Sequence, residues 1–456
     1  MAERADVVIV GAGCAGLSLA ARLADPALGR ALAGRRVVVV DGRTAFPRDR
    51  TWCYWDVHPH PFAAAATHNW TRWRVATARG VVERGSARYA YRHVPADAFY
   101  AEALARVRRA PHVALRLGAP VRAVTDEGEA LRVDTAAGPI HAACVFDSRP
   151  PGPPDRGGSA GGAPRLVQAF AGAVVRTAAP AFDPAAATLM DFTAPWDGPG
   201  VGFGYVLPYA ADEALVELAV IAPAAPAPEA LERALARYVR RLTGGRPHEA
   251  RLREAGVIPM DASRVERRPS PRVVRVGLAG GMARPSTGYA FLAIQRDAAA
   301  AADALAQALA GGGPPGAAAL CTRLGDPLGA GAGAWLGACA RPPRGGAAGW
   351  LDRVFLGGLA SDFAAAPALF ARLFAAAPPD ALVRFLSDVA TPGDVARVVG
   401  ALPVLPFAAE AGRTTLAAVR AAVRRPTVSA SDNRARPAPV FTRSRAAVAG
   451  RPPRVP

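Results

Sequence analysis

A short glycine-rich turn, Val10-Gly-Ala-Gly-Cys-Ala-Gly16, constrains the fold of this chain more than any other feature. The apolar run Ala5–Val10 before it is typical of a buried parallel strand, and leucines at helical spacing follow it as far as Ala24. A second valine-rich run, Arg35–Asp41, completes a strand–helix–strand unit. Glycines at these positions allow a tight turn, close approach of the backbone to a pyrophosphate, and packing of helix on strand. The segment therefore predicts a Rossmann-like dinucleotide-binding domain.

The late segment Gly280–Tyr289 favours FAD over NAD as the dinucleotide, because an isoalloxazine requires a second contact region. The phosphates would lie at the helix N-terminus, where free N–H groups favour anions. Asp41 would accept the ribose hydroxyls, and the insert 25–34 accounts for its distance from the turn. Cys14 is predicted to be a small buried side chain rather than a redox group. The predicted cofactor contacts are Gly11, Ala12, Gly13, Cys14, Ala15, Gly16, Asp41, Asp147, Gly280, Gly281, Met282, Pro285, Gly288 and Tyr289.

The remaining pattern predicts a strand-dense middle and a helical end. Residues 50–55 are expected to form an aromatic-rich loop, and residues 150–164, rich in Pro and Gly, a linker. Strands are predicted at 112–124, 131–135, 143–147, 166–177, 188–193, 201–209, 214–221 and 273–276. Helices are predicted at 94–109, 228–243, 289–310, 351–359, 367–374 and 379–386.

These elements suggest a division of the chain into five parts. Residues 1–150 are expected to form the first part of the FAD-binding domain, and residues 261–312 its returning segment. Between them, residues 165–260 would form the substrate domain. Residues 313–425 would be a helical region and residues 426–456, which have little to bury, a disordered tail.

Composition excludes several classes of function. The net charge of +18 comes from arginines scattered along all 456 residues, which argues against nucleic-acid binding and allows loose attraction to anionic lipid headgroups. The five cysteines have neither metal-ligand nor disulfide-framework spacing, as a reducing cytoplasmic setting would predict. The first strand begins too early to leave room for a signal peptide, and no apolar run is long enough to predict a spanning helix.

Several further runs occur in a specific order along residues 5–410. They are Asp49–Trp55, Val145–Arg149, Leu189–Phe192, Tyr205–Pro208, Ala214–Glu217, Gly256–Met260, Ala279–Tyr289, Arg384–Leu386 and Leu402–Phe407. In this order they resemble the lycopene cyclase family, in its bacterial FAD-dependent form. The chain departs from that pattern at Leu218, where many relatives have a second acid, and at Thr193 and Ala194, where relatives carry arginine and an acid.

The resemblance implies an α/β (α+β) fold in which a parallel, Rossmann-like FAD-binding sheet is joined to an antiparallel-sheet substrate domain. It implies an isomerase that folds the ends of lycopene, or a related polyene, into β-ionone rings. FAD would act in its reduced form without net redox change, and NAD(P)H would be the reductant. The enzyme would be cytoplasmic and peripherally associated with the membrane in which its substrate dissolves. The departures leave the product pattern open, and the oligomeric state is also open.

Glu217 is the predicted catalytic acid. On a strand it shares a face with Leu215 and Ile221, and a carboxyl among apolar neighbours tends to stay protonated near neutral pH. Such an acid can protonate an alkene carbon and start a cyclisation. Asp191, on another predicted strand, could share a proton with Glu217, tune the flavin, stabilise a cation or be a structural hydrogen-bond acceptor. Reduced flavin is a rival for the acid–base role.

Two other functions are compatible with the same motifs. One is an FAD-dependent monooxygenase or prenyl-chain reductase, and the other is a non-catalytic carotenoid-binding flavoprotein. Trp52, Tyr54 and Trp55 would either line a polyene tunnel or form domain-interface core. The phenylalanine-rich region 351–407 is the predicted membrane-facing mouth of such a tunnel, with ordinary core as the alternative. The histidines have no metal-ligand pattern, so no metal site is predicted.

Overall fold

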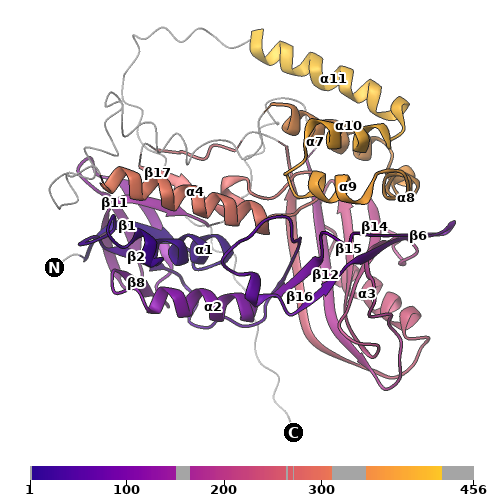
Figure 1. Ribbon diagram of the computed structural model, residues 1–456, viewed down its shortest axis with the longest axis horizontal. Coiled ribbons are helices and arrows are strands. Elements are labelled where there is room, and N and C mark those ends of the chain that lie inside the picture. Colours follow the sequence, from indigo (N-terminus) through magenta and orange to yellow (C-terminus); the bar gives the residue numbers. More distant parts are fainter. Residues whose placement is uncertain (1–2, 150–164, 263–264, 271, 311–345, 424–456) are drawn as a thin grey trace.

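Two seven-stranded sheets organise the chain in the computed structural model, which describes residues 3–149, 165–262, 265–270, 272–310 and 346–423 (Figure 1). The predicted linker at 150–164, the end of the segment 261–312, the first part of the helical region and the tail at 426–456 fall outside the described residues.

The first sheet is parallel at its centre, with strand order β8-β2-β1-β11-β10-β9, and β17 pairs with β11. Even-numbered valines of β1 and β2 face one hydrophobic cluster and odd-numbered residues face another, which α1, α2 and α4 cover (Figure 1). Burial on both faces is typical of parallel strands and confirms the Rossmann-like prediction. The strands are β1 (Glu3–Val10), β2 (Val37–Val40), β8 (Val113–Arg116), β9 (Val121–Asp126), β10 (Leu131–Thr135), β11 (Gly138–Asp147) and β17 (Val273–Arg275). The helices are α1 (Cys14–Leu23), α2 (Ala96–Arg108), α4 (Phe291–Ala310) and the short turns η1 (Pro26–Leu28) and η3 (Gly277–Gly280).

The second sheet is mostly antiparallel, with strand order β16-β12-β15-β14-β13-β5-β6. Helix α3 (Pro228–Leu242) packs against one face, on Val216, Leu218 and Val220 of β15. The alternate residues of β15, including Leu215 and Ile221, therefore face the other side of the sheet. The strands are β5 (Arg72–Thr77), β6 (Gly80–Gly85), β12 (Leu166–Thr177), β13 (Ala187–Asp191), β14 (Val201–Pro208), β15 (Glu213–Ala222) and β16 (His248–Met260).

A third, three-stranded sheet corrects the prediction for residues 50–55. The expected loop is strand β3 (Thr51–Trp55), which pairs with β7 (Tyr91–Pro95), and β7 pairs with β4 (His68–Trp70); the short turn η2 (Ala63–Ala65) lies between β3 and β4. The strand forms because alternating side chains are buried on both sides: Tyr54 packs in the cluster of the first sheet and Trp55 in that of the second.

Segment 1–150 is therefore not solely part of the cofactor domain. Its strands β5 and β6 belong to the second sheet, where β5 runs parallel to β13. The first and second sheets are therefore not formed by two consecutive segments of the chain.

The C-terminal helices pack on the second sheet, on the face opposite α3. Phe370 and Leu373 contact the same cluster as Leu215 and Phe203. The predicted helices at 351–359, 367–374 and 379–386 are confirmed, whereas of the predicted phenylalanine-rich mouth Phe370 and Phe374 are buried core. Within the described ranges no single helix is long and apolar enough to cross a bilayer, although α7 and α8 would pass that test together as a sharply bent pair. The helices are α7 (Gly346–Ser361), η4 (Phe363–Ala365), α8 (Ala366–Ala376), α9 (Pro379–Leu386), α10 (Pro392–Gly400) and α11 (Val404–Val423).

Candidate active site

Glu217 lies at the centre of the second sheet, on the face that the C-terminal helices cover. Its register partners are Tyr205 on β14 and Gly172 on β12, and Gly172 in turn is paired with Glu254 on β16. These four residues form one row across four adjacent strands. Because side chains in one row of a sheet point to the same face, the two glutamates converge over Gly172.

The two carboxyl groups form a coupled pair. A side-chain hydrogen bond joins the two groups. Glu254 Oε1 is buried and has no hydrogen-bond partner among the described residues, so it would lack a donor if both groups were ionised. Burial, the charge of Glu254 and this hydrogen bond raise the pKa of Glu217 well above its usual value. Burial also raises the pKa of Glu254, and hydrogen bonds with Glu217 and Thr51 and the charges of Arg48 and Arg50 oppose part of that rise. Glu217 is thus the member of the pair that keeps a proton.

Tyr205, a member of this row, and three groups from β3, β7 and the loop before α4 form a cluster of aromatic and thiol side chains. The hydroxyl of Tyr91 lies 3.0 Å from that of Tyr205 and 3.4 Å from that of Tyr289, and Cys53 is hydrogen-bonded to Tyr205. Burial raises the pKa of each of these groups, so all four are neutral near pH 7. They can donate hydrogen bonds and present aromatic faces, but they do not act as bases. Their convergence is not visible in the sequence.

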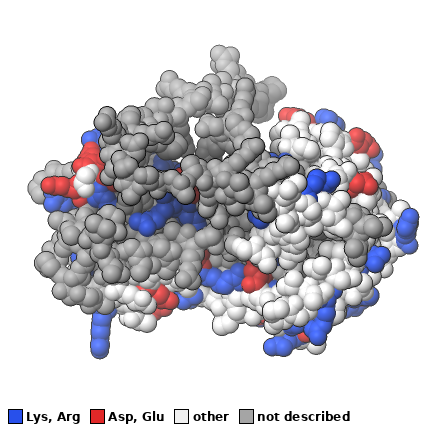
Figure 2. All heavy atoms as spheres, turned by 90° about the horizontal axis from the view of Figure 1, so that it is seen from above, with Lys and Arg blue, Asp and Glu red and all other residues white. Residues whose placement is uncertain are grey.

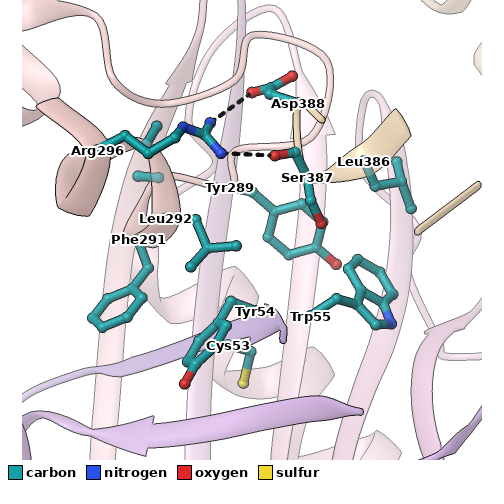
Figure 3. A pocket seen from close by; sticks show the side chains of 12 residues that line it. Cys53, Tyr54, Trp55, Tyr289, Phe291, Leu292, Arg296, Leu386, Ser387 and Asp388 are labelled. Carbon is teal, nitrogen blue, oxygen red and sulfur yellow. Dashed lines mark hydrogen bonds and ion pairs between the residues drawn. The ribbon is translucent and has the colours of Figure 1, made fainter. Parts of the chain in front are cut away.

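A pocket opens beside this cluster (Figure 3). Trp55 and Tyr289 are in T-shaped contact on its inner side, and Arg296 donates a hydrogen bond of 3.1 Å to the Ser387 carbonyl on another side. The indole N–H of Trp55 is buried and has no hydrogen-bond partner among the residues that the structure describes. The pocket is lined by Cys53, Tyr54, Trp55, Tyr289, Ala290, Phe291, Leu292, Ala293, Arg296, Leu386, Ser387 and Asp388.

The glycine turn at the end of β1 forms a cradle for an anion. Gly11 has a φ of +97°, which favours glycine, and a Cβ on Gly16 would overlap the carbonyl oxygen of Gly11. A Cβ on Gly13 would meet only Arg43 Nη2, at 3.9 Å, so this side of the turn is open. Helix α1 begins at Cys14 with neither a side-chain cap nor an acidic residue in its first turn. Its free N–H groups and dipole suit the pyrophosphate of a dinucleotide.

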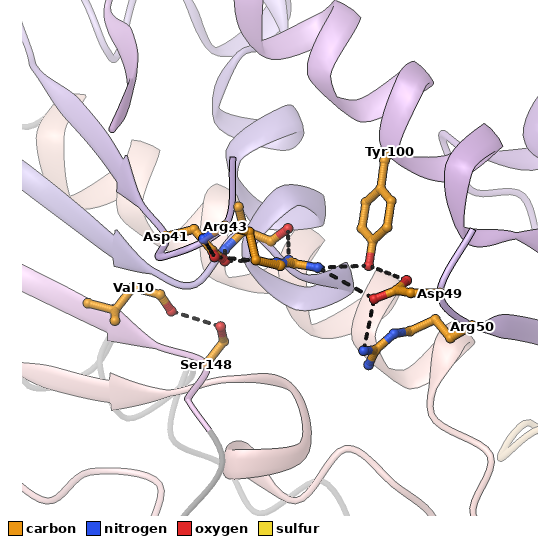
Figure 4. A network of polar contacts seen from close by, with 8 residues as sticks. Val10, Asp41, Arg43, Asp49, Arg50, Tyr100 and Ser148 are labelled. Carbon is orange, nitrogen blue, oxygen red and sulfur yellow. Dashed lines mark hydrogen bonds and ion pairs between the residues drawn. The ribbon is translucent and has the colours of Figure 1, made fainter. Parts of the chain in front are cut away.

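Asp41 holds the cradle from the end of β2 (Figure 4). It accepts hydrogen bonds from the backbone N–H of Ala12 at 2.5 Å and of Arg43 at 2.7 Å, and Arg43 Nη2 donates to the Ala12 carbonyl at 2.8 Å. Arg43, which sequence reasoning missed, therefore links Asp41 to the turn. The predicted ribose contact of Asp41 stays a prediction.

Asp147 also lies at this edge of the first sheet, as the end of β11 requires, where Arg149 Nη2 approaches its carboxylate to 2.6 Å. The Cys14 side chain is buried, as predicted, and burial raises its thiol pKa to about 12.

The returning segment reaches the cradle and the second sheet in turn. Gly277, with a φ of +63°, leaves room for Ala15 at the start of α1, since a Cβ there would lie 2.7 Å from the Ala15 methyl. The chain then passes through Gly280, Gly281 in a left-handed conformation and the buried Met282. At Gly288 a Cβ would lie 3.3 Å from Ile258 of β16, so this loop lies against the second sheet.

A buried ion network fixes the loop that carries Pro285 and Tyr289. The backbone carbonyl of Arg284 accepts a hydrogen bond of 2.7 Å from the Gly288 N–H, and the Arg284 N–H donates one of 2.8 Å to the Tyr289 carbonyl. Its guanidinium lies 3.4 Å from Asp352 of α7, and Ser286 donates to the same carboxylate at 2.6 Å. The predicted contacts of this loop with a flavin remain predictions, but the network ties the loop to the C-terminal helices.

Asp191 does not meet Glu217, so the predicted proton sharing between them is wrong. Its register partner Gly204 is next to Tyr205, and alternation places Asp191 on the α3 face of the sheet. There it accepts a hydrogen bond of 2.9 Å from the Tyr238 hydroxyl of α3 and one of 2.6 Å from Thr193. It is a structural acceptor.

The part of the chain that the structure describes contains no group of three His, Cys, Asp or Glu side chains that could hold a metal ion. The buried His93 has its pKa lowered to about 3 by burial, so it is a neutral core residue.

Solved structures share this architecture at low sequence identity. A geranylgeranyl bacteriochlorophyll reductase-like protein from Thermoplasma acidophilum aligns over 91% of this chain and 100% of its own, with a TM-score of 0.59 and 14% identity. The flavin-dependent brominase Bmp2 aligns over 92% and 99%, with a TM-score of 0.55 and 15% identity. Identities this low show the fold alone.

Sequence comparison identifies the family. No curated protein matches the chain significantly, but the family model described as lycopene cyclase protein matches residues 6–411. A match of this extent covers both large sheets and most of the C-terminal helices. The chain belongs to the lycopene cyclase family.

Proposed function

We propose that the chain is a lycopene β-cyclase that forms β-ionone rings at the ends of lycopene without net redox change. The observation that carries the proposal is the buried acid Glu217, paired in register with Tyr205, whose hydroxyl joins those of Tyr91 and Tyr289. Burial raises the pKa of Glu217 well above its usual value, which favours its protonated form. Family membership supports a carotenoid polyene as substrate. The fold neighbours that are flavin enzymes support FAD as cofactor.

The reaction needs one proton, which is returned. Glu217 delivers its proton to a terminal alkene carbon and becomes a carboxylate, and the neighbouring double bond attacks the resulting tertiary cation to close the ring. A proton then leaves the ring carbon as the new double bond forms, and Glu217 recovers it. One C–C bond forms at the expense of one C=C π bond, the proton is returned, and no electrons are gained or lost.

The aromatic groups around Glu217 suit the cationic step. The faces of Trp55, Tyr91 and Tyr205 offer electron density to positive charge, which is worth about 2 kcal/mol or more when water is excluded. FAD would lie on the glycine cradle, Asp41 and the returning segment, and in reduced form, maintained by NAD(P)H, it supplies an electron-rich ring. Helices α7, α8 and α9 cover this face of the sheet and exclude water.

We also propose a cytoplasmic enzyme in peripheral contact with a membrane, because the substrate is a long hydrocarbon. The described surface over α7 to α10 is largely uncharged, with charged side chains mainly at its rim (Figure 2). Val399 of α10 and Leu416 of α11 are exposed there by 41% and 50%. Exposed apolar groups on a largely uncharged surface are compatible with contact with lipid.

Expression in a lycopene-accumulating host, followed by pigment chromatography, tests the function. We expect cyclised product from the wild type, none from Glu217→Gln with flavin still bound, and normal yield from Glu213→Gln, a control on the same strand. Normal turnover by Glu217→Gln would refute the role of this acid. A product of altered mass with matching consumption of NAD(P)H would identify a monooxygenase or reductase instead. Bound but unchanged lycopene would identify a carotenoid-binding flavoprotein.

A further inference from the structure

We propose that Glu254 is a positioning residue for the reaction. It shares one proton with Glu217, and the two side chains meet across the gap that Gly172 leaves in β12. Through this shared proton Glu217 begins each cycle as an acid and recovers the proton from the ring cation. The role in turnover rests on the proposed function, whereas the shared proton is a property of the resting protein.

The sheet order makes the contact possible. Glu254 on β16 and Glu217 on β15 are separated by β12, so their backbones are about 10 Å apart at the usual strand spacing. Two glutamate side chains span this distance only if nothing stands between them. The residue between them is Gly172, and a Cβ there would lie 2.6 Å from Glu217 Cγ. Any larger residue would push the carboxyl groups apart.

The number of protons follows from the hydrogen-bond partners. With both groups ionised, two negative charges would meet in a buried site and Glu254 Oε1 would lack a donor. One proton removes the repulsion and supplies the missing donor. Arg48, Arg50 and Thr51 act on Glu254 and favour its ionised form, so the proton resides on Glu217.

Among the described residues, the thiol and phenol groups that face the pair keep their charge near neutral pH. On β3, β7, β14, the residues after β14 and the loop before α4, burial raises the pKa of each facing thiol or phenol above the neutral range. The proton of the pair is therefore the one that a titration of this site measures. The facing groups are Arg48, Arg50, Cys53, Tyr91, Tyr205, Tyr209 and Tyr289.

The pair also explains proton return. When Glu217 has given its proton to the alkene, two ionised carboxylates lie in contact, and this is a less stable state than the singly protonated pair. The repulsion is relieved when Glu217 takes the proton from the ring carbon. In this scheme Glu254 stays ionised while the proton moves between Glu217 and the substrate.

Infrared spectroscopy of the purified protein without substrate tests the shared proton directly. We expect a protonated-carboxyl band at neutral pH that shifts in D₂O, disappears in Glu217→Gln and persists in Glu254→Gln. In Glu254→Gln the band should titrate away about one pH unit or more lower, because groups coupled this closely shift each other's pKa by at least that amount. Gly172→Ala, which keeps both carboxyls but separates them, should shift it in the same direction. Glu249→Gln, on the exposed part of β16, is the matched control and should titrate as the wild type does.

Two results would overturn the inference. One is an unchanged titration in Glu254→Gln, and the other is a band that disappears in Glu254→Gln but remains in Glu217→Gln. The alkaline limit of cyclase activity should move to lower pH by the same amount in Glu254→Gln, which a purely structural role would not cause. Lycopene left unchanged by a protein with the expected titration would overturn the proposed function and leave the shared proton in place.

Discussion

Loss of Asp352 should destabilise the folded protein by about 3 kcal/mol. This residue of α7 is 1% exposed and accepts hydrogen bonds from Ser286 at 2.6 Å and from Arg284 at 3.4 Å. Burial lowers the pKa of Arg284 and the Asp352 charge opposes this, so Asp352→Ala leaves a buried cation poorly paired. Breaking a buried pair costs about 3 to 5 kcal/mol, and the lower end applies because Arg284 keeps Asp388 at 3.4 Å and the Phe385 carbonyl.

Urea unfolding followed by tryptophan fluorescence measures this loss. The matched control is Asp197→Ala, since Asp197 pairs with Arg237 at 2.7 Å but its side chain is 77% exposed, and the cost there should be at most about 0.5 kcal/mol. Adding Arg284→Met to Asp352→Ala should recover part of the stability, because the buried charge is then gone. Equal costs for Asp352→Ala and Asp197→Ala would refute the argument that burial decides the strength of this pair.

Three further predictions follow from the site. Asp191→Ala should lower stability by about 1 to 2 kcal/mol by removing the acceptor of Tyr238, and turnover per folded molecule should not change; lost turnover in the folded protein would contradict a structural role. The raised pKa of Glu217 means that the folded state keeps a proton that the unfolded chain releases above pH 4.5, so stability falls as pH rises towards the folded pKa. Urea unfolding at pH 5 to 8 should therefore show a free energy of unfolding that changes with pH, and Glu217→Gln should make this slope shallower by about 1.4 kcal/mol per pH unit. Identical slopes in the two proteins would count against a buried proton. Gly13→Ala should fold, because the added Cβ would lie 3.9 Å from Arg43 Nη2. Its flavin-to-protein ratio, measured by absorbance, should fall below about a tenth of the wild-type value. Full flavin occupancy would argue against a pyrophosphate on this turn.

The cofactor half of the site was predictable because its signals are local. The turn from Gly11 to Gly16 and the acid Asp41 lie within one strand–helix–strand unit, so spacing alone placed them together. Glu217 was also predictable, from apolar neighbours two residues away on its own strand. Strand β3 was mistaken for a loop because its aromatic residues serve two different clusters, which the sequence does not reveal.

Glu254 and Asp191 depend instead on strand register. Strand β16 is at the sheet edge, and the exposed, charged residues of its first half hid the strand pattern. A signal was present: Glu254, Gly256, Ile258 and Met260 alternate with exposed residues and so share one face. The sequence contains no comparable signal that Asp191 and Glu217 lie on opposite faces, because that follows only from the pairing of β13 and β14 with β15.

The exchange of strands between the sheets has a consequence for biosynthesis. Strand β5 is synthesised early but pairs with β13, which follows more than a hundred residues later. The first sheet likewise lacks β17 until residue 275 has been synthesised. At about 5 to 20 residues per second, the ribosome needs about 15 to 60 s from the glycine turn to the end of α4. During that time the nascent chain exposes unpaired strand edges and cannot hold flavin. Cofactor loading is therefore one of the last events in the maturation of this protein, and chaperones that protect half-made sheets should determine its yield.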